Sequence, residues 1–390
     1  MNVLLLVPEF PPEPGGIARS AARLVDGLVD AGLHVVVVTK DSSSSPPPGL
    51  DVGRARLRDG CDVLRFPYGA FHPQHWAREL AELYRQLDGV EPHVVHAMGT
   101  LRFGQVALAV GRRFGAAVVY GMRGSDVNVA ALEHPGRFAS IMRGADALTA
   151  VSRRLAERAV SRSPYPRAVT IIPNAVPPAA SRDRAQLRRE IGFAVGTPLV
   201  GARLNERWNK GPERLLYMLR DVSRLATQPL GLCLFGADDG GAFAAAWRAG
   251  GDAAARPYRH IGEVEAGRVL DALSPLDLLV TSSHYEGMPN LMLEALSVGT
   301  PVAATPAGGC AEVLEDGDAG VLLSWDEAAA AGEIAQLVAS GRLAAMRAGA
   351  QQHVETHYAP QRETQAVHAV YQSLVASTAA RDAASRGVGG

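Results

Sequence analysis

Short, continuously apolar runs alternate with longer segments of helical periodicity along most of the chain. The first run, "NVLLLVP" at 2–8, is typical of a strand buried on both faces of a sheet. Apolar residues then recur at helical spacing from Ile17 to Val29, and Gly32 ends that segment. The next buried run is "HVVVVTK" at 34–40. This order of strand, loop, helix and strand predicts parallel pairing of the two strands.

The alternation continues in two blocks on either side of a Pro- and Ala-rich segment at 174–183. The first block predicts further strands at 62–67, 93–98, 116–122, 147–152 and 168–173. The second block predicts strands at 198–204, 231–237, 258–264, 277–283, 301–306 and 320–324, and helices near 212–226, 241–249 and 290–298. The pattern predicts an α/β fold of two Rossmann-like, doubly wound domains, with ligands in the cleft between them.

We place the domain boundary at residue 178, so that the first domain is 1–178 and the second begins at 179. The segment "DSSSSPPPGLDVG" at 41–53 is expected to be an exposed loop. The last residues, 377–390, lack an apolar pattern and are expected to form a flexible tail.

Composition removes several classes of function. The chain has 390 residues and a net charge of −1, which gives no indication of a nucleic-acid partner. The three cysteines are scattered, which favours a reducing cytoplasm over a disulfide framework. No apolar run approaches 18 residues, and the start lacks the features of a signal peptide. We therefore expect a cytoplasmic protein without a transmembrane segment, although peripheral membrane contact stays open.

The clearest candidate chemistry lies in "HYEGMPNLMLEALSVGTPV" at 284–302. A buried strand ends just before it, and a helix is predicted to begin near Pro289. The N-terminus of that helix offers an anion site, and Gly287 lets the backbone approach a ligand. Glu286 and Glu294 flank this site, where their carboxylates can accept hydrogen bonds from hydroxyls on either side of a phosphate. A capping glutamate and a surface glutamate would give the same spacing.

The block from Glu286 to Glu294, followed by "GTPVAATPAGGCAE", resembles the retaining glycosyltransferases of family 4 (GT4), which have the GT-B fold. The likeness covers nearly the whole chain. It implies an N-terminal acceptor-binding domain and a C-terminal nucleotide-sugar-binding domain at 179–358. It also implies that a terminal helix at 359–376 returns to the N-terminal domain.

The resemblance implies a role for each matching position. Glu286 would hold hydroxyls of the donor sugar, and Glu294 would hold the ribose of the nucleotide. The segment between them would cradle the sugar and the distal phosphate through Gly287, Met288, Pro289, Asn290 and Leu291. A second segment, "HIGEV" at 260–264, resembles the part that meets the nucleobase, so Val264 is a further donor-binding candidate.

The segment "GARLNERWNKGPERLL" at 201–216 resembles the Arg…Lys-Gly part of the same family. A departing diphosphate accumulates negative charge, which Arg203 and Lys210 would neutralise. Lys210 is one of only two lysines in the chain. The spacing is slightly longer than in the family, so Arg207 could replace Arg203.

Candidates in the first domain are weaker. In "PEPGG" at 12–16, Gly15 and Gly16 would let the backbone approach the diphosphate, but a tight turn would look the same. "YGMRGSDVN" at 120–128 carries Arg123 where the family has histidine, and Asp126 matches an aspartate that also fits a helix cap. His96 lies at the end of the strand predicted at 93–98 and suits either a sugar or acceptor contact or a structural histidine.

Two further patterns have structural explanations. Trp76, Leu80, Leu83, Tyr84 and Leu87 form a helical stripe, which favours a core face over an acceptor or membrane surface. "DGD" at 316–318 resembles a metal motif but lies in a turn-like stretch. No His/Cys cluster has zinc spacing, so we expect no metal and no cofactor beyond the nucleotide-sugar donor.

The sequence therefore predicts a metal-independent, retaining hexosyltransferase. It would move glucose or N-acetylglucosamine from a UDP-sugar to a hydroxyl acceptor, in natural-product or cell-surface glycan synthesis. Two alternatives stay open, namely a sugar-nucleotide epimerase or phosphorylase of the same fold, and a non-catalytic two-domain ligand-binding protein. The acceptor, the base of the donor and the oligomeric state are not predicted.

Overall fold

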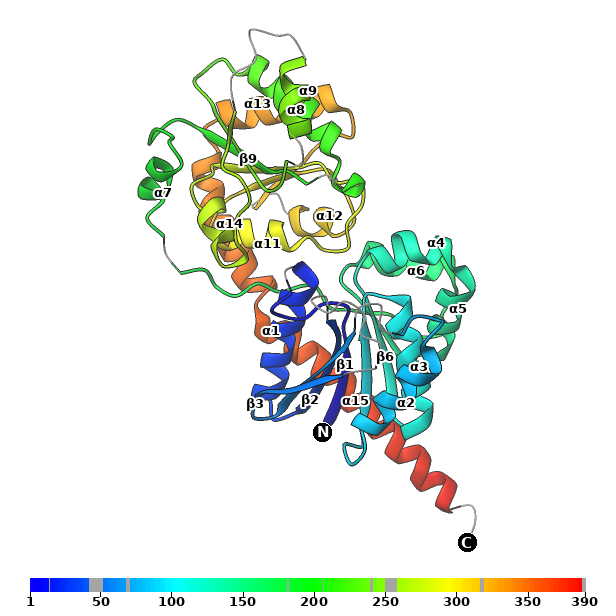
Figure 1. Ribbon diagram of the computed structural model, residues 1–390. Coiled ribbons are helices and arrows are strands. Elements are labelled where there is room, and N and C mark those ends of the chain that lie inside the picture. Colours follow the sequence, from blue (N-terminus) through cyan, green and yellow to red (C-terminus); the bar gives the residue numbers. More distant parts are fainter. Residues whose placement is uncertain are drawn as a thin grey trace. The chain divides into compact units, whose positions relative to one another are not determined.

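The computed structural model describes residues 1–13, 15–41, 52–67, 71–180, 182–205, 207–238, 241–249, 258–315 and 319–387. The chain divides into two compact units (Figure 1). Unit 1 comprises Met1–Asn174 and Pro360–Gly390, and unit 2 comprises Ala175–Ala359. Most of the loop expected at 41–53 and the whole of the turn expected at 316–318 lie outside the described residues.

Unit 1 contains an eight-stranded sheet in the order β3-β4-β2-β1-β5-β6-β7-β8, in which only the pair β3–β4 is antiparallel. Its strands are β1 (Asn2–Leu6), β2 (His34–Asp41), β3 (Gly53–Arg58), β4 (Cys61–Pro67), β5 (Val94–Met98), β6 (Ala117–Met122), β7 (Ala147–Ala150) and β8 (Thr170–Ile171). Its helices are α1 (Gly16–Asp30), α2 (Trp76–Gln86), α3 (Leu101–Phe114), α4 (Ala131–Glu133), α5 (Pro135–Gly144), α6 (Arg153–Arg162) and α15 (Pro360–Gly387), with a π-helical turn at Asp126–Ala130. The predicted parallel order of the first two strands is confirmed, since Asn2 pairs with His34.

Unit 2 contains a six-stranded, wholly parallel sheet in the order β11-β10-β9-β12-β13-β14. Its strands are β9 (Leu199–Arg203), β10 (Gly231–Phe235), β11 (Arg259–His260), β12 (Leu278–Thr281), β13 (Val302–Ala304) and β14 (Gly320–Leu322). Its helices are α7 (Arg184–Glu190), α8 (Pro212–Leu225), α9 (Ala242–Ala249), α10 (Val269–Leu273), α11 (Asn290–Ser297), α12 (Gly309–Leu314), α13 (Glu327–Ala339) and α14 (Leu343–His357), with short 3₁₀ turns at Trp208–Lys210 and Ala266–Arg268.

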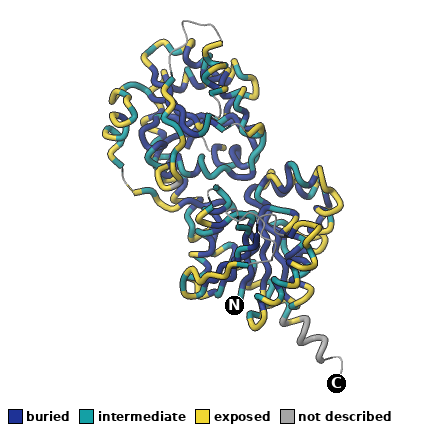
Figure 2. Tube along the Cα trace, viewed as in Figure 1, coloured by how far each residue is buried: buried dark blue, intermediate teal, exposed yellow. Residues whose placement is uncertain are grey.

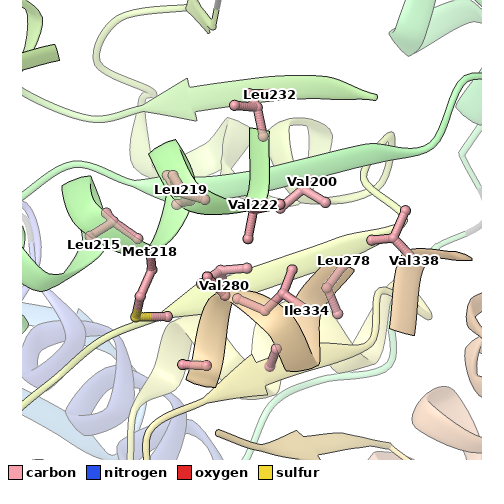
Figure 3. Packing of buried hydrophobic residues seen from close by; sticks show 14 of the residues in the cluster. Val200, Leu215, Met218, Leu219, Val222, Leu232, Leu278, Val280, Ile334 and Val338 are labelled. Carbon is pink, nitrogen blue, oxygen red and sulfur yellow. The ribbon is translucent and has the colours of Figure 1, made fainter. Parts of the chain in front are cut away.

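The buried apolar strands of each unit form its core, because parallel strands are covered on both faces. In unit 2 the cluster joins side chains of β9 and β12 to the facing sides of α8 and α13, as Val200, Val280, Leu219 and Ile334 illustrate (Figure 3). In both units the sheets are mostly buried, and the exposed positions lie mainly on helices, loops and the outermost strands β3 and β11 (Figure 2). The loops at the carboxyl ends of β9 and β12 thus rest on a rigid support.

Two features differ from the predictions. The sequence analysis gave no strand between 53 and 58, yet β3 runs there with mostly exposed residues. The segment contains arginines at 54, 56 and 58 and therefore lacks the apolar run expected of a buried strand. An edge strand can have such a composition because it needs no buried face. The predicted end of the terminal helix is also corrected, since α15 continues to Gly387 rather than ending at 376. The alanine-rich composition of that segment favours helix.

The beginning of α15 is fixed to α1 within unit 1. Arg23 Nε donates to Glu363 Oε2 at 2.9 Å, and the Glu363 side chain is only 3% exposed. Val367 and Tyr371 lie in the same apolar cluster as Leu24 and Leu28. The last helix of the chain is therefore an integral part of the N-terminal unit.

Candidate active site

The site of interest in unit 2 is a pocket at the carboxyl ends of β9 and β12. These strands are parallel neighbours, with Leu278 paired to Val200, so the loops that follow them leave the same edge of the sheet. This edge is where doubly wound sheets bind ligands. The lining residues of this Glu286 pocket are Arg203, Asn205, Lys210, Leu215, Val280, Thr281, Ser282, Ser283, Glu286, Pro289, Leu291 and Met292.

An ion pair lies at the centre of the Glu286 pocket. Lys210 Nζ is 2.6 Å from Glu286 Oε1, and Ser283 Oγ donates to the same oxygen at 2.7 Å. The Glu286 side chain is 11% exposed and that of Lys210 is 33% exposed. Because the pair is partly shielded from water, each charge is felt more strongly than on an open surface. Glu286 Oε1 is thus fixed by two donors, and Lys210 presents a positive charge in the pocket.

The backbone around Lys210 requires a glycine. Gly211 has a φ of +62°, and a Cβ there would lie 2.3 Å from the Ser282 carbonyl oxygen. The Ser282 hydroxyl donates to the carbonyl oxygens of Lys210, at 3.0 Å, and of Gly211, at 2.9 Å. These contacts join the loop after β9 to the loop after β12, and so they hold Lys210 against Glu286.

A second glycine-dependent contact packs the start of α12 against the backbone of Glu286. Gly308 has a φ of +54°, and a Cβ there would lie 2.1 Å from the Glu286 carbonyl oxygen. The neighbouring Gly309 N–H donates to the Gly287 carbonyl oxygen at 2.9 Å. The "GG" of "PAGGCAE" thus permits close packing of the α12 start under the loop that carries Glu286.

Helix α11 begins at Asn290, with Pro289 at its N-cap position. No side chain caps its first turn, so its N–H groups face the loop after β12. Met292, Leu293 and Leu296 are buried and anchor the helix. Pro289 and Leu291 line the Glu286 pocket, whereas the half-buried Glu294 does not. Gly287 and Met288 are buried in the preceding turn.

The remaining predicted donor residues fall in different places. Arg203, at the exposed end of β9, lines the pocket together with Lys210, and Arg207 is not among the lining residues. The structure thus pairs Arg203, not its alternative, with the lysine. Val264 lines a separate pocket beyond β11, which β10 separates from β9. The structure therefore does not bring Val264 together with Glu286.

In unit 1, Gly15 and Gly16 lie where α1 begins. Gly15 has a φ of +145°, and a Cβ there would lie 2.7 Å from Glu9 Oε2. Gly16 is the first residue of α1, which has no acidic residue in its first turn. The start of α1 thus has no acidic side chain that would repel an anion, and it is also the tight turn that the sequence left as the alternative.

His96 is buried inside unit 1, with 3% of its surface exposed. Its Nδ1 lies 2.7 Å from the Tyr371 hydroxyl of α15, whereas Nε2 has no hydrogen-bond partner among the described residues. Burial, assisted by the charge of Arg123, lowers the pKa of His96 to about 3. The ring is therefore neutral, and its hydrogen bond to Tyr371 is a structural one.

Asp126 is buried, with 1% exposure, and its partners are protein groups. Its carboxylate accepts the backbone N–H groups of Arg123, at 3.1 Å, and Gly124, at 2.7 Å, and the Tyr120 hydroxyl at 3.0 Å. Burial raises the pKa of Asp126, while the backbone donors oppose that change. Asp126 thus fixes the turn that carries Arg123. Arg123 lines a small cavity together with His96 and Glu363.

The stripe on α2 is only partly a core face. Leu83 and Leu87 are fully buried, whereas Trp76, Leu80 and Tyr84 are half-buried. These three line an open groove whose polar rim includes Arg102, Arg112 and Arg137. The prediction of a core face holds for the two leucines but not for the other three residues.

Sequence reasoning missed Ser283 and Asn205, which line the Glu286 pocket. Both are polar residues that follow a buried strand, so the rule that ligands bind beyond carboxyl strand ends could have found them. Ser283 also lies three residues before Glu286, and its hydroxyl contacts that carboxylate. The polar residues that line the Glu286 pocket therefore include Ser283 and Asn205 in addition to the predicted glutamate and cations.

Two searches over the described part of the chain concern metals and membranes. No cluster of three or more His, Cys, Asp or Glu side chains there could hold a metal ion. No described helix has both the length and the apolar character needed to cross a bilayer.

Comparison with known proteins matches each unit to a glycosyltransferase family model. Residues 15–175 match the "Glycosyl transferase 4-like domain" family, and residues 198–340 match the "Glycosyl transferases group 1" family. A Bacillus subtilis protein named as a teichuronic acid biosynthesis glycosyltransferase is 29% identical over 273 residues, which cover 65% of each chain. A GDP-mannose-dependent alpha-mannosyltransferase of Mycobacterium tuberculosis is 27% identical over 351 residues, which cover 84% of this chain and 85% of that one.

Solved structures support the same assignment at the level of fold. Sucrose-phosphate synthase from Thermosynechococcus elongatus superposes with a TM-score of 0.78 at 17% identity, over 96% of this chain and 99% of that one. Anabaena HepE in complex with UDP-glucose superposes with a TM-score of 0.71 at 16% identity, over 96% and 100% of the two chains. The two parallel-sheet units have the GT-B fold, and the two domain matches together identify the chain as a glycosyltransferase of the GT4/GT-B type.

Proposed function

We propose that the protein is a retaining, metal-independent glycosyltransferase that moves glucose or N-acetylglucosamine from a UDP-sugar to a hydroxyl acceptor. The observation that carries this proposal is the ion pair of Lys210 and Glu286 in a pocket beyond β9 and β12. A sugar diphosphate needs both an acceptor of hydroxyl hydrogen bonds and a cation. The pocket supplies Glu286 for the first and Lys210 with Arg203 for the second.

The proposed reaction breaks the bond between the anomeric carbon and the diphosphate oxygen. The diphosphate keeps the electron pair, and Lys210 and Arg203 stabilise the charge that develops on it. The acceptor oxygen bonds to the anomeric carbon from the same face, and the departing diphosphate takes its proton. Glu286 is already bonded to Lys210 and Ser283, which suits sugar binding better than nucleophilic attack.

We assign donor binding mainly to unit 2, with Gly15 and Gly16 of unit 1 as further donor-binding candidates. We assign the main acceptor site to unit 1, with His96, Arg123 and Asp126 as candidates for an acceptor or sugar contact. Arg123 occupies the place of the family histidine, and Asp126 positions its backbone. The three free, buried cysteines fit a reducing compartment, so we propose that the reaction occurs in the cytoplasm.

GDP-mannose is the second candidate donor. It is favoured by the mannosyltransferase relative, whose name specifies that donor and whose alignment covers 84% of this chain. Backbone contacts in the segment after β11 would distinguish uracil from guanine only weakly, so the pocket geometry does not decide between them.

A donor screen tests the proposal. UDP-glucose, UDP-N-acetylglucosamine and GDP-mannose are each incubated with a panel of hydroxyl acceptors, and products are detected by mass. We expect nucleotide release that depends on an acceptor, retention of the anomeric configuration, and equal rates with and without EDTA. Binding of a nucleotide sugar without turnover against any acceptor would instead identify a ligand-binding protein. Interconversion of the sugar without transfer would identify an epimerase.

Glu294→Ala is expected to weaken nucleotide binding about ten- to hundredfold, because a hydrogen bond to a carboxylate is worth roughly 1.5–3 kcal/mol. The measurement is calorimetric titration with UDP and with 2′-deoxy-UDP. If Glu294 accepts from the ribose, the substitution costs less affinity for the deoxynucleotide than for UDP. Glu355→Ala, on the exposed side of α14, is the control. Equal losses for both nucleotides would remove the ribose role.

A further inference from the structure

An aromatic cluster of the exposed Trp208 and the half-buried His284 and Tyr285 adjoins the Glu286 pocket in unit 2. Trp208 is 69% exposed, and its ring stacks on His284 with centroids 5.1 Å apart and an interplanar angle of 21°. Tyr285 is the third member, with its centroid 5.9 Å from that of Trp208. Single apolar residues on a surface need no explanation, but three rings gathered beside a polar pocket are a different feature.

The cluster is attached directly to the residues of the pocket. Trp208 opens the 3₁₀ turn that ends at Lys210, and His284 and Tyr285 immediately precede Glu286. The His284 N–H donates to the Asn209 carbonyl oxygen at 2.9 Å, which joins the two loops. The rings are therefore fixed in position relative to the ion pair of Lys210 and Glu286.

The position of the cluster argues against a nucleobase as its ligand. The loops that carry it follow β9 and β12, which are direct neighbours. The segment after β11, which we assign to the base, lies two strands from β9, or roughly 10 Å away. A ligand stacked on Trp208 is thus near the sugar and the reacting bond rather than near the base.

We propose that Trp208, supported by His284, is a stacking subsite for a pyranose ring of the acceptor. One face of such a ring presents C–H groups, which favour an aromatic surface, while its hydroxyls stay in water. A rigid indole loses little conformational entropy on binding, which makes it an effective anchor. This inference rests on the proposed function, and it assigns part of the acceptor binding to unit 2.

The first test needs no turnover. The UDP-saturated protein is titrated with methyl glycosides of glucose, galactose, mannose and N-acetylglucosamine, and acrylamide quenching of tryptophan fluorescence is measured. At least one glycoside should reduce quenching in the wild type, and this protection should be absent in Trp208→Ala. Trp325→Ala is the matched control, because Trp325 is a 46% exposed tryptophan of the same unit that stacks under Arg214 instead.

The second test measures kinetics with the donor and acceptor found in the screen. Truncating an aromatic residue that stacks a base costs about five- to 150-fold in affinity, and a partly polar sugar ring belongs at the low end. Trp208→Ala should raise the acceptor KM about five- to tenfold and leave UDP affinity unchanged. Trp208→Phe keeps an aromatic face, so its acceptor KM should stay close to that of the wild type. Loss of UDP affinity in Trp208→Ala would show that Trp208 contacts the donor rather than the acceptor, and would overturn the inference. Unchanged quenching and KM would overturn the inference even where transfer itself is observed.

Discussion

Lys210→Ala is expected to lower kcat about 10²- to 10³-fold while changing donor affinity much less. The reason is that charge on the diphosphate grows as the glycosidic bond breaks, so a cation acts mainly on the transition state. Lys210 lies in the Glu286 pocket with its Nζ 2.6 Å from Glu286 Oε1. Steady-state kinetics with the donor identified in the screen measures the effect.

Two further variants make this prediction specific. Lys210→Arg keeps the charge but replaces a compact ammonium by a planar fork, so partial recovery of kcat is expected. Arg224→Ala removes a cation that is paired with Asp221 on the surface of α8, and should leave kcat unchanged. A rise in donor KM at constant kcat in Lys210→Ala would mean that the lysine serves ground-state binding only.

The architecture was predictable because its strongest signal is local. Buried parallel strands such as 34–40 and 277–283 are short apolar runs that no other element of this length imitates. The exposed strand β3 was missed because three arginines alternate along it and its neighbour β4 covers only one edge. The length of α15 was underestimated because alanine propensity, rather than an amphipathic face, extends that helix.

Only the part of the site that lies within one contiguous segment of the chain was predictable from the sequence. The segment from Glu286 to Leu291 is contiguous, so its strand, turn and helix start follow from the sequence. The contact between Lys210 and Glu286 joins residues 76 positions apart, and it depends on the close approach of Gly211 to Ser282. Spacing within one segment could not distinguish Arg203 from Arg207, because the direction of β9 decides which side chain enters the pocket.

A charge cluster of unit 2, in which Arg188 is buried and Asp277, Arg184 and Arg347 are half-buried, carries the largest expected effect on stability. Asp277 accepts from Arg184, Arg188 and the Leu199 N–H, the last at 2.8 Å. Arg347 is close enough to feel their charges, and burial followed by repulsion from Arg184 lowers its pKa to about 10. One carboxylate therefore compensates three arginines at the amino end of β12.

Asp277→Asn is expected to destabilise unit 2 by about 3–5 kcal/mol, because it leaves the buried Arg188 and the half-buried Arg184 and Arg347 without a counter-charge. Denaturation followed by tryptophan fluorescence reports mainly on this unit, which holds Trp208, Trp247 and Trp325 of the four tryptophans. Asp271→Asn is the matched control. It removes a partly exposed partner of Arg182, 2.8 Å away, and should cost about 0–1 kcal/mol.

The pH dependence of stability tests the role of Asp277 independently. Burial alone would raise the pKa of Asp277, but Arg184, the Leu199 N–H and Arg188 outweigh it, so the pKa is lowered below its usual value. The stabilisation by this carboxylate is therefore complete above the pKa of an unfolded aspartate, about 3.9, and is lost as pH falls through the lower folded value. The difference in stability between wild type and Asp277→Asn should thus be constant at neutral pH and shrink only in that acidic range. A difference that already shrinks near pH 6 would show that another group, rather than Asp277, compensates the arginines.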